Sequence, residues 1–342
     1  MNILFVSAVL PYPLYSGGQV RIYNLLRLLG KEHKITLLSF IRSPEERTYV
    51  EELSFCHRVE TVVRGNAWQA KYILPTLFGS YPLLFSTYQN RAMREKIVTL
   101  LATGDYDLLH LEPGYVWPSV PSVSLPIVVT QHNIEYPIYE EYVRRFPVPP
   151  LRPFLWLDTV KLRFWEEYTW KHATRIVAVS DQDRDVIARS APGVPVSVIP
   201  NGVDLLSFPF RPRQIDGIRP TFLFVGNFSW VQNRDAVTHL LRAIWPKLLE
   251  QYPGAKLNIV GRNAPRELAR LISEKGAHLL DRVTRIRDEF EASDILIAPI
   301  RVGGGTKFKI LEAMASGLPV VTTHIGGSGL DLIAGQEIIE AD

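Results

Sequence analysis

The sequence contains a single cysteine, Cys56, among 342 residues, so no disulfide can form within the chain. This indicates a reducing compartment or indifference to redox conditions, and it excludes a zinc cluster held by cysteines. No stretch of about 18 apolar residues occurs, so no membrane-spanning helix is expected. The first apolar run, Ile3–Leu10, is short and has no Lys or Arg before it, which argues against a signal peptide. These absences predict a cytoplasmic protein and leave open a peripheral contact with the inner face of the membrane.

A large excess of charge of either sign is also missing. The formal net charge is only +3, from 38 Lys and Arg against 35 Asp and Glu. A nucleic-acid-binding protein usually has a stronger basic excess, so no nucleic-acid partner is expected. A weak basic excess still fits an anionic ligand or an anionic membrane surface. Hydrophobic residues make up 46% of the chain, which is ample core material, and the length predicts two domains.

The first part of the chain alternates apolar runs with helical patterns. Ile3–Val9 reads as a buried strand, a loop with Gly17 and Gly18 follows, Gln19–Gly30 has the spacing of a helix, and Lys34–Phe40 is the next strand. This strand–helix–strand order predicts a doubly wound parallel sheet. Further strands are predicted at Val59–Val63, Leu108–Glu112, Pro126–Thr130, Arg175–Val179 and Val196–Ile199.

The same alternation restarts after the turn at Asn201. Thr221–Val225 and Lys256–Val260 read as strands, each followed by glycine, with a helix predicted over Asp235–Glu250 between them. We therefore predict an α/β protein with an N-terminal domain over residues 1–200 and a C-terminal domain over residues 201–342. Both are expected to be Rossmann-like and to face a shared cleft, because ligands bind beyond the carboxyl ends of such strands.

The segment Arg301–Val321 combines glycines, lysines and a helix start. A strand at Asp294–Pro299 is followed by the turn Gly303-Gly304-Gly305-Thr306, and a helix is expected from about Lys307 to Gly317. Glycines let the backbone approach a ligand, and a helix N-terminus with unpaired N–H groups suits a phosphate. Lys309 and Glu312 lie three residues apart and share a helix face. A plain glycine turn is the alternative, but it needs neither of these charges.

The segment Leu151–Trp170 is rich in aromatic residues, with Arg and Lys between them. This composition is typical of an amphipathic helix. Packing against its own domain is the favoured interpretation, and docking on lipid is the alternative.

Several short motifs follow one another along nearly the whole chain. Besides the segment just described they are SGGQVR (Ser16–Arg21), QHNIE (Gln131–Glu135), VSDQD (Val179–Asp183), VIPNGVD (Val198–Asp204), FVGNFSWVQNRDAV (Phe224–Val237) and IVGRNAP (Ile259–Pro265). In this order and spacing they make the chain resemble glycosyltransferase family 4, whose members are retaining enzymes of the GT-B fold. The GGGT-x-x-K-x-LEAMA motif resembles one branch of that family.

In the N-terminal domain the resemblance implies two site elements. Gly17 and Gly18 match the family's glycine loop, whose backbone lies near the donor diphosphate; an ordinary turn is the alternative. His132 matches the active-site histidine that contacts the transferred sugar, and capping of the strand end is the alternative. Arg21 is a secondary candidate, expected at the surface or behind the site.

In the C-terminal domain the resemblance implies a donor site with unusual features. Glu312 matches the second of two paired glutamates, which holds the ribose, whereas Gly304 stands where the first is expected. Asn227 and Asn233 stand where many relatives carry an Arg and a Lys. We therefore assign the diphosphate charge to Lys309. The full set of expected donor-site residues is Gly17, Gly18, Gly303, Gly304, Gly305, Thr306, Lys309 and Glu312, with Asn227, Asn233 and Arg301 as secondary candidates.

The reaction implied is transfer of a hexose from a nucleoside-diphosphate sugar to a hydroxyl with retention of configuration, in glycan, polysaccharide or glycolipid synthesis. His132 and Lys309 are the expected catalytic residues, and positioning and charge stabilisation are their tasks. No metal or other cofactor is expected. Asp181-Gln182-Asp183 has the form of a metal-binding motif, but it fits the capped start of a helix better.

Two other functions compete with this one. A non-catalytic protein that binds sugar nucleotides would explain the missing glutamate and the missing basic pair. An NAD-dependent dehydrogenase is disfavoured, because no G-x-G-x-x-G follows Ile3–Val9. The expected acceptor is a sugar or a lipid-linked molecule; donor base, sugar, linkage and oligomeric state are not predicted. Relatives have closing helices after the strand expected at Glu337–Ile339, and these are expected to be missing here.

Overall fold

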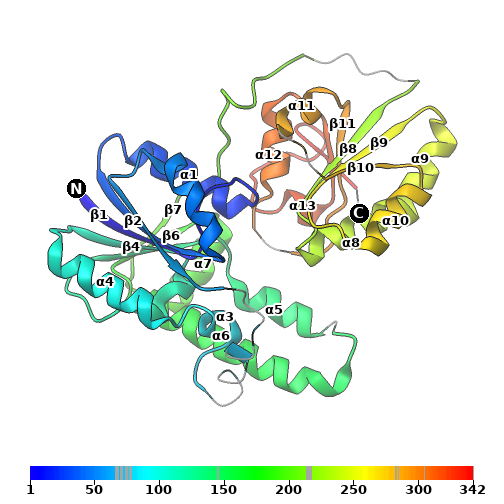
Figure 1. Ribbon diagram of the computed structural model, residues 1–342. Helices are drawn as coiled ribbons and strands as arrows, with labels where there is room; N and C mark the ends of the chain where they lie inside the picture. Colours follow the sequence, from blue (N-terminus) through cyan, green and yellow to red (C-terminus); the bar gives the residue numbers. More distant parts are fainter. Residues whose placement is uncertain are drawn as a thin grey trace. The chain divides into compact units, whose positions relative to one another are not determined.

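The computed structural model describes the whole chain except residues 66–68, 70, 71, 74, 75, 77, 78, 145, 213–217, 282, 284, 304 and 342. The chain divides into two compact units, Met1–Pro200 and Asn201–Asp342 (Figure 1). Each unit is built on its own parallel β-sheet with helices around it. The prediction of two Rossmann-like α/β domains is therefore confirmed.

The N-terminal domain has a seven-stranded sheet in the order β3-β2-β1-β4-β5-β6-β7. Adjacent strands are parallel throughout, and the register of β1 against β4 places Ser7 opposite Glu112. The strands are β1 (Asn2–Ser7), β2 (Lys34–Ile41), β3 (Arg58–Val63), β4 (Leu108–Glu112), β5 (Ile127–Gln131), β6 (Arg175–Ala178) and β7 (Val196–Val198).

Both faces of this sheet are covered by helices. Side chains alternate along β1, so Ile3 and Phe5 pack with α1, while Leu4 and Val6 lie in the cluster that holds α4, α6 and α7. Helix α5 lies along α6 (Figure 1). The α-helices are α1 (Gly17–Leu29), α3 (Leu83–Ser86), α4 (Arg91–Thr103), α5 (Glu135–Arg144), α6 (Arg152–His172) and α7 (Asp181–Ser190); the 3₁₀ segments are η1 (Pro44–Leu53), η2 (Gly114–Ser119) and η3 (Pro149–Leu151).

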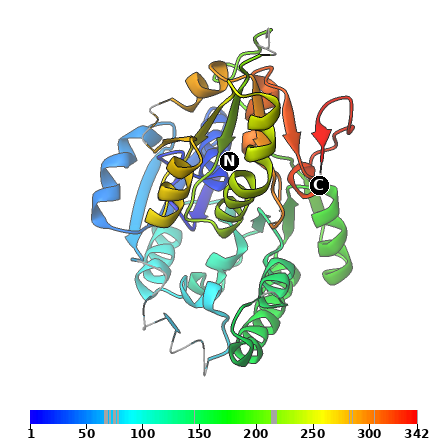
Figure 2. The ribbon, with the colours of Figure 1, turned by 90° about the vertical axis from the view of Figure 1, so that its right-hand side faces the viewer.

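The C-terminal domain repeats this architecture with a six-stranded parallel sheet in the order β10-β9-β8-β11-β12-β13. Helices α8 and α9 lie against the sheet of their domain in both ribbon views (Figures 1 and 2). The strands are β8 (Thr221–Val225), β9 (Lys256–Val260), β10 (His278–Leu280), β11 (Ile295–Ala298), β12 (Val320–Thr322) and β13 (Ile339–Glu340); the helices are α8 (Val231–His239), the π-helical η4 (Leu240–Ile244), α9 (Trp245–Gln251), α10 (Arg266–Glu274), α11 (Ile286–Glu291), α12 (Phe308–Ala315) and α13 (His324–Gly327).

Strand order reverses at one place in each sheet, between β1 and β4 in the first domain and between β8 and β11 in the second. In sheets of this kind the loops after the two strands part at the reversal and leave room for a ligand. The loop Arg301–Thr306 follows β11, and Asn227 follows β8. The predicted donor-site loop thus lies at the reversal point of its own domain.

Two local predictions differ from the structure. Gly17 and Gly18 were expected in a loop, but they form the first turn of α1, because the Ser16 side chain caps that helix by accepting from Gln19 N. The helix expected over Asp235–Glu250 begins earlier, at Val231, and contains the π-helical turn η4. Pro246, at the start of α9, cannot donate a backbone hydrogen bond, which accounts for the wider turn before it.

None of the helices within the described ranges combines the length and the apolarity that crossing a membrane requires.

Candidate functional site

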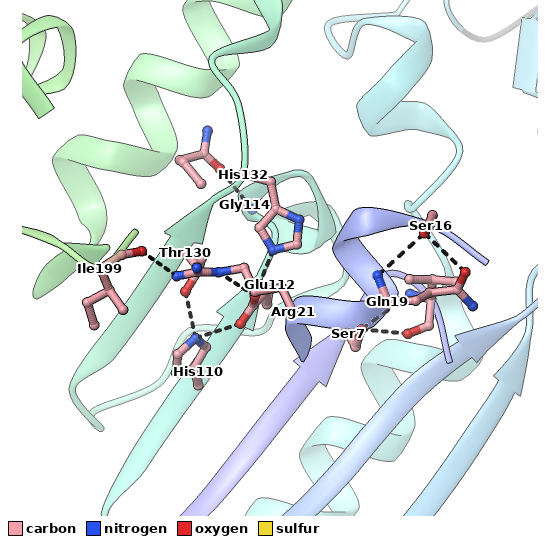
Figure 3. Close-up of polar contacts among 12 residues, drawn as sticks. Ser7, Ser16, Gln19, Arg21, His110, Glu112, Gly114, Thr130, His132 and Ile199 are labelled. Carbon is pink, nitrogen blue, oxygen red and sulfur yellow. Dashed lines mark hydrogen bonds and ion pairs between the residues drawn. The ribbon is translucent and has the colours of Figure 1, made fainter. Parts of the chain in front are cut away.

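Glu112 occupies the reversal point of the N-terminal sheet and was not singled out in the sequence. It ends β4 opposite Ser7, and its side chain is fully buried. Three basic side chains surround it: His132 Nε2 lies 2.6 Å from Oε1, His110 Nε2 lies 3.3 Å from Oε2, and Arg21 Nε lies 3.9 Å from Oε1 (Figure 3). A carboxylate at the end of an apolar strand was the signal available in the sequence.

His132 comes directly after β5 and points toward the first turn of α1. Its Nδ1 would lie 3.2 Å from a Cβ at Gly18, so only glycine fits there without displacing the ring. The structure therefore brings together two residues that were predicted separately, His132 and Gly18, and adds Glu112 on the other side of the ring (Figure 3).

The charge on Glu112 fixes how the His132 ring can act. Burial alone would raise the pKa of Glu112, but the nearby His110 ring and the hydrogen-bonded His132 ring outweigh it, so the pKa lies well below its ordinary value. An ionised Glu112 accepts a hydrogen bond from the N–H at His132 Nε2, which leaves Nδ1 as the edge that faces α1. In the neutral ring Nδ1 is an acceptor, available to a hydroxyl group.

Arg21 is buried rather than exposed, and it acts within the domain. Its guanidinium donates to Ile199 O at 2.8 Å and to Pro200 O at 3.1 Å, which ties α1 to the segment that ends the domain. Its charge also lies beside Glu112. Arg21 thus supports the Glu112 carboxylate from behind, which is one of the two positions expected for it.

A second buried carboxylate, Glu166 on α6, holds the turn that carries His132. Glu166 accepts hydrogen bonds from Glu135 N and Tyr136 N, both at 2.9 Å, at the start of α5. Gln131 donates to the same carboxylate at 3.4 Å and accepts from Gly114 N at 3.1 Å. The Gln131 side chain before His132 and the backbone at Glu135 after it are therefore both held by hydrogen bonds to Glu166.

In the C-terminal domain Lys309 lies against the residues after β8. Its Nζ donates to Asn233 Oδ1 at 2.8 Å and lies 4.6 Å from the centre of the Phe224 ring. Asn233 in turn donates to Asn227 O at 2.9 Å. Three residues that were predicted separately, Asn227, Asn233 and Lys309, are therefore in one chain of contacts.

Charge in this part of the domain is strongly affected by burial. Burial lowers the pKa of Lys309 to about 7, with Lys307 acting in the same direction and Glu312 opposing it. Burial also lowers the pKa of Lys307 to about 8 and raises the pKa of Glu312 to about 7. An added anion near Lys309 would favour its charged form.

The glycine turn before α12 needs glycine for its backbone shape. Gly303 has φ of 121° and Gly305 has φ of 67°, both in the region that side chains rarely allow. Gly304 lies outside the described residues. Lys307 donates to Gly305 O, and Thr306 accepts from Asn201 Nδ2.

The helix that was predicted from about Lys307 begins at Phe308, with Lys307 as its N-cap. The first helical N–H groups therefore belong to Phe308 and Lys309.

Arg301 does not join the Lys309 group. It forms an exposed two-point ion pair with Asp235 of α8, at 2.7 and 3.1 Å. The motif Asp181-Gln182-Asp183 forms the capped start of α7. Ser180 precedes this helix, and its side chain accepts from Asp183 N at 3.1 Å.

The family model described as Glycosyltransferase Family 4 matches residues 15–206, more than half of the chain. The chain belongs to glycosyltransferase family 4. A second model, Glycosyl transferases group 1, matches residues 219–338. The chain is therefore a glycosyltransferase by family, and both domains contribute to that assignment.

Curated relatives of this family 4 chain include an uncharacterized 44.6 kDa protein in the cps region of Klebsiella pneumoniae. It is 23% identical, over all of this chain and 87% of that protein. The phosphatidyl-myo-inositol mannosyltransferase of Mycolicibacterium smegmatis is 29% identical over 68% of this chain. The match spans 58% of the mannosyltransferase.

Solved structures show the same fold. Anabaena HepE in complex with UDP and glucose has a TM-score of 0.64 at 17% identity, covering 98% of this chain and 84% of HepE. WaaG, a glycosyltransferase involved in lipopolysaccharide biosynthesis, has a TM-score of 0.62 at 15% identity, covering 95% of this chain and 82% of WaaG. The expected GT-B fold is confirmed.

Proposed function

We propose that this glycosyltransferase moves a hexose from a nucleoside-diphosphate sugar to a hydroxyl group, with retention of the anomeric configuration. The observation that carries the proposal is the contact of Lys309 with Asn233 at the reversal point of the C-terminal sheet. The resemblance expects a lysine at position 233, where this sequence has asparagine. Lys309 Nζ lies beside Asn233 and would supply the positive charge there. The missing basic pair is therefore a weaker argument for a non-catalytic binding protein than it was from sequence.

The chemical steps follow from what each domain offers. The bond between the anomeric carbon and the donor's diphosphate oxygen breaks, the acceptor oxygen bonds to the same carbon on the same face, and the acceptor's proton passes to the leaving diphosphate. Lys309 and the first N–H groups of α12 would stabilise the diphosphate, which requires no metal in this scheme. His132, held by Glu112, would hydrogen-bond the transferred sugar through Nδ1.

A role in making cell-surface glycans fits the relatives. One is encoded in a cps region, one is named as acting on phosphatidyl-myo-inositol, and one structural neighbour takes part in lipopolysaccharide biosynthesis. HepE was solved with UDP and glucose, so UDP sugars are the first donors to test.

A thermal-shift screen of UDP, GDP and dTDP sugars tests the donor assignment. A ligand that binds only the folded protein raises its midpoint of unfolding, and binding well above Kd should give a shift of a few degrees, on the order of 2–4 °C. One nucleotide class should shift the midpoint more than the others. The same midpoint with every nucleotide sugar and nucleoside diphosphate would contradict the donor assignment.

The protein is also proposed to contact the membrane through α6. Leu162, Glu166 and Trp170 of this helix pack into the domain, as the favoured interpretation predicted. The helix and the residue before it also expose large apolar side chains, with Phe154 and Phe164 each at least 60% exposed. These residues are Leu151, Phe154, Trp156, Leu157, Val160 and Phe164. Aromatic side chains of this kind partition into the interface of a bilayer, and Arg152 favours anionic lipid.

Replacing both Phe154 and Trp156 with serine is expected to lower the fraction of protein that sediments with phosphatidylglycerol vesicles several-fold. The matched control is Leu206→Ser in the C-terminal domain, because Leu206 is 89% exposed but lies outside α6. Equal sedimentation of the double variant and the wild type would rule out α6 as the contact.

A further inference from the structure

A small recess opens at the carboxyl ends of β1, β2 and β3 in the N-terminal domain. Its volume is about 50 Å³, and its walls include Val9, Phe40, Arg42, Arg64 and Tyr88. One water molecule takes up roughly 30 Å³ in the liquid, so the recess has room for the oxygens of one small group rather than for a sugar ring.

The two arginines are neighbours because of the sheet register. Ile41 of β2 pairs with Val63 of β3, and Arg64 N donates to Ile41 O at 2.8 Å. Arg42 and Arg64 are therefore the first residues beyond the ends of two adjacent strands. Parallel strands place such residues at the same edge of the sheet.

The Tyr88 ring orients the guanidinium of Arg64 and leaves its N–H groups able to donate hydrogen bonds. Its Cζ lies 4.7 Å from the centre of the buried Tyr88 ring, so the cation stacks on the aromatic face. A stacked guanidinium can still bind a carboxylate or phosphate with two parallel hydrogen bonds.

Within the described ranges, neither Arg42 nor Arg64 has an ion-pair partner. One carboxylate does line the recess: Glu46 accepts from the backbone N–H of Arg42 at 3.0 Å. The residues that line the recess therefore include two arginines and one glutamate, which together carry a net positive charge.

The recess adjoins the His132 site within the same domain. Ala8, on its wall, donates from its backbone N–H to Glu112 O at 3.0 Å. Tyr88 also contacts Tyr115, three residues after Glu112, with ring centres 4.8 Å apart. A molecule whose hydroxyl lies near His132 could extend into the recess.

We propose that Arg42 and Arg64 bind an anionic group on the acceptor, a phosphate or a carboxylate, and so select acceptors that carry one. This inference rests on the proposed function. It concerns the part of the acceptor that lies away from the reacting hydroxyl. Neutral acceptors would leave the two arginines at the recess without an anionic partner, so neutral acceptors should bind more weakly.

The test compares binding of probes that differ in charge, by titration of the full chain without donor. D-Glucose, D-glucuronate and D-glucose 6-phosphate are the probes. At least one anionic probe should bind roughly tenfold or more tightly than glucose, as expected for a charged hydrogen-bonded pair. The preference should disappear in Arg64→Gln and in Arg42→Gln, and it should weaken when salt rises from about 50 to 500 mM. Glucuronate and glucose 6-phosphate then distinguish a carboxylate from a phosphate.

Two control variants locate the anion. Arg91→Gln removes an exposed arginine of α4 from the same domain and should keep the preference. Lys309→Ala removes the cation of the proposed donor site and should also keep the preference for anionic probes. Equal affinity for all three probes would overturn the proposal, and so would a preference lost in Lys309→Ala but kept in Arg64→Gln. Because no donor is present, either result is independent of whether the chain cleaves a nucleotide sugar.

Discussion

Replacing Lys309 with alanine is expected to lower donor turnover by roughly 10²- to 10³-fold, the loss typical of removing one group that stabilises developing charge. The reason is geometric: Asn233 and the Phe224 ring hold Nζ at the reversal point of the sheet, where the leaving diphosphate would lie. Turnover is measured as nucleoside diphosphate released from the donor found by the screen.

The control for this variant is Lys256→Ala. Lys256 is an exposed lysine that begins β9, at the opposite end of the strand from the loops of the reversal point. Both variants should keep the wild-type circular dichroism spectrum. Wild-type turnover by Lys309→Ala would remove Lys309 from the reaction, and an equal loss in Lys256→Ala would indicate an effect of net charge.

The lowered pKa of Lys309 predicts that donor binding is coupled to proton uptake. Its pKa is about 7 in the protein without donor, and a diphosphate beside Nζ would raise it. Donor binding at pH 8 should therefore take up protons, which calorimetry in buffers of different ionisation enthalpy measures. The uptake should be smaller in Lys309→Ala.

His132→Ala is expected to lower kcat by roughly 10²-fold, at the low end of the range for a positioned histidine, with nucleoside-diphosphate affinity changed by no more than about twofold. Nδ1 of His132 faces the first turn of α1, while Lys309, the cation assigned to the diphosphate, lies in the other domain. Steady-state kinetics and nucleotide titration separate the two effects. An equal loss of kcat and nucleotide affinity would make His132 a binding residue only.

Glu112→Gln tests whether the buried carboxylate acts through His132. The amide keeps the shape of the side chain but removes the charge that holds the proton on Nε2, so kcat should fall roughly tenfold or more, as for a histidine held in the wrong tautomer. His172→Ala, an exposed histidine on α6, is the matched control and should leave kcat unchanged. If Glu112→Gln has wild-type kcat, Glu112 only stabilises the fold.

The strand positions could be predicted because a continuous apolar run that ends at glycine or a polar residue indicates a buried strand. Gly17 and Gly18 were placed in a loop because glycine usually ends a helix, and the cap formed by Ser16 outweighed that preference. Glu112 was missed because its role depends on which strands are neighbours. It meets His132 twenty residues further on only because β4 and β5 pair in parallel.

The same limit applies in the C-terminal domain. The sequence places Lys309 on a helix face with Glu312, but its contact with Asn233 spans 76 positions and requires the pairing of β8 with β11. Arg42 and Arg64 carry no sequence motif, and only the register of β2 and β3 makes them neighbours. Local patterns predicted the elements, while strand pairing determined which side chains meet.

Cleavage of a nucleotide sugar and transfer of the sugar with retention is the proposed activity of this family 4 chain. The most direct measurement is proton NMR of the chain incubated with the donor selected by the screen and a hydroxyl acceptor. The expected result is release of the nucleoside diphosphate and a product whose anomeric proton shows the donor's configuration. An inverted product would contradict retention, and a donor that stays intact although it binds would show a non-catalytic sugar-nucleotide-binding protein.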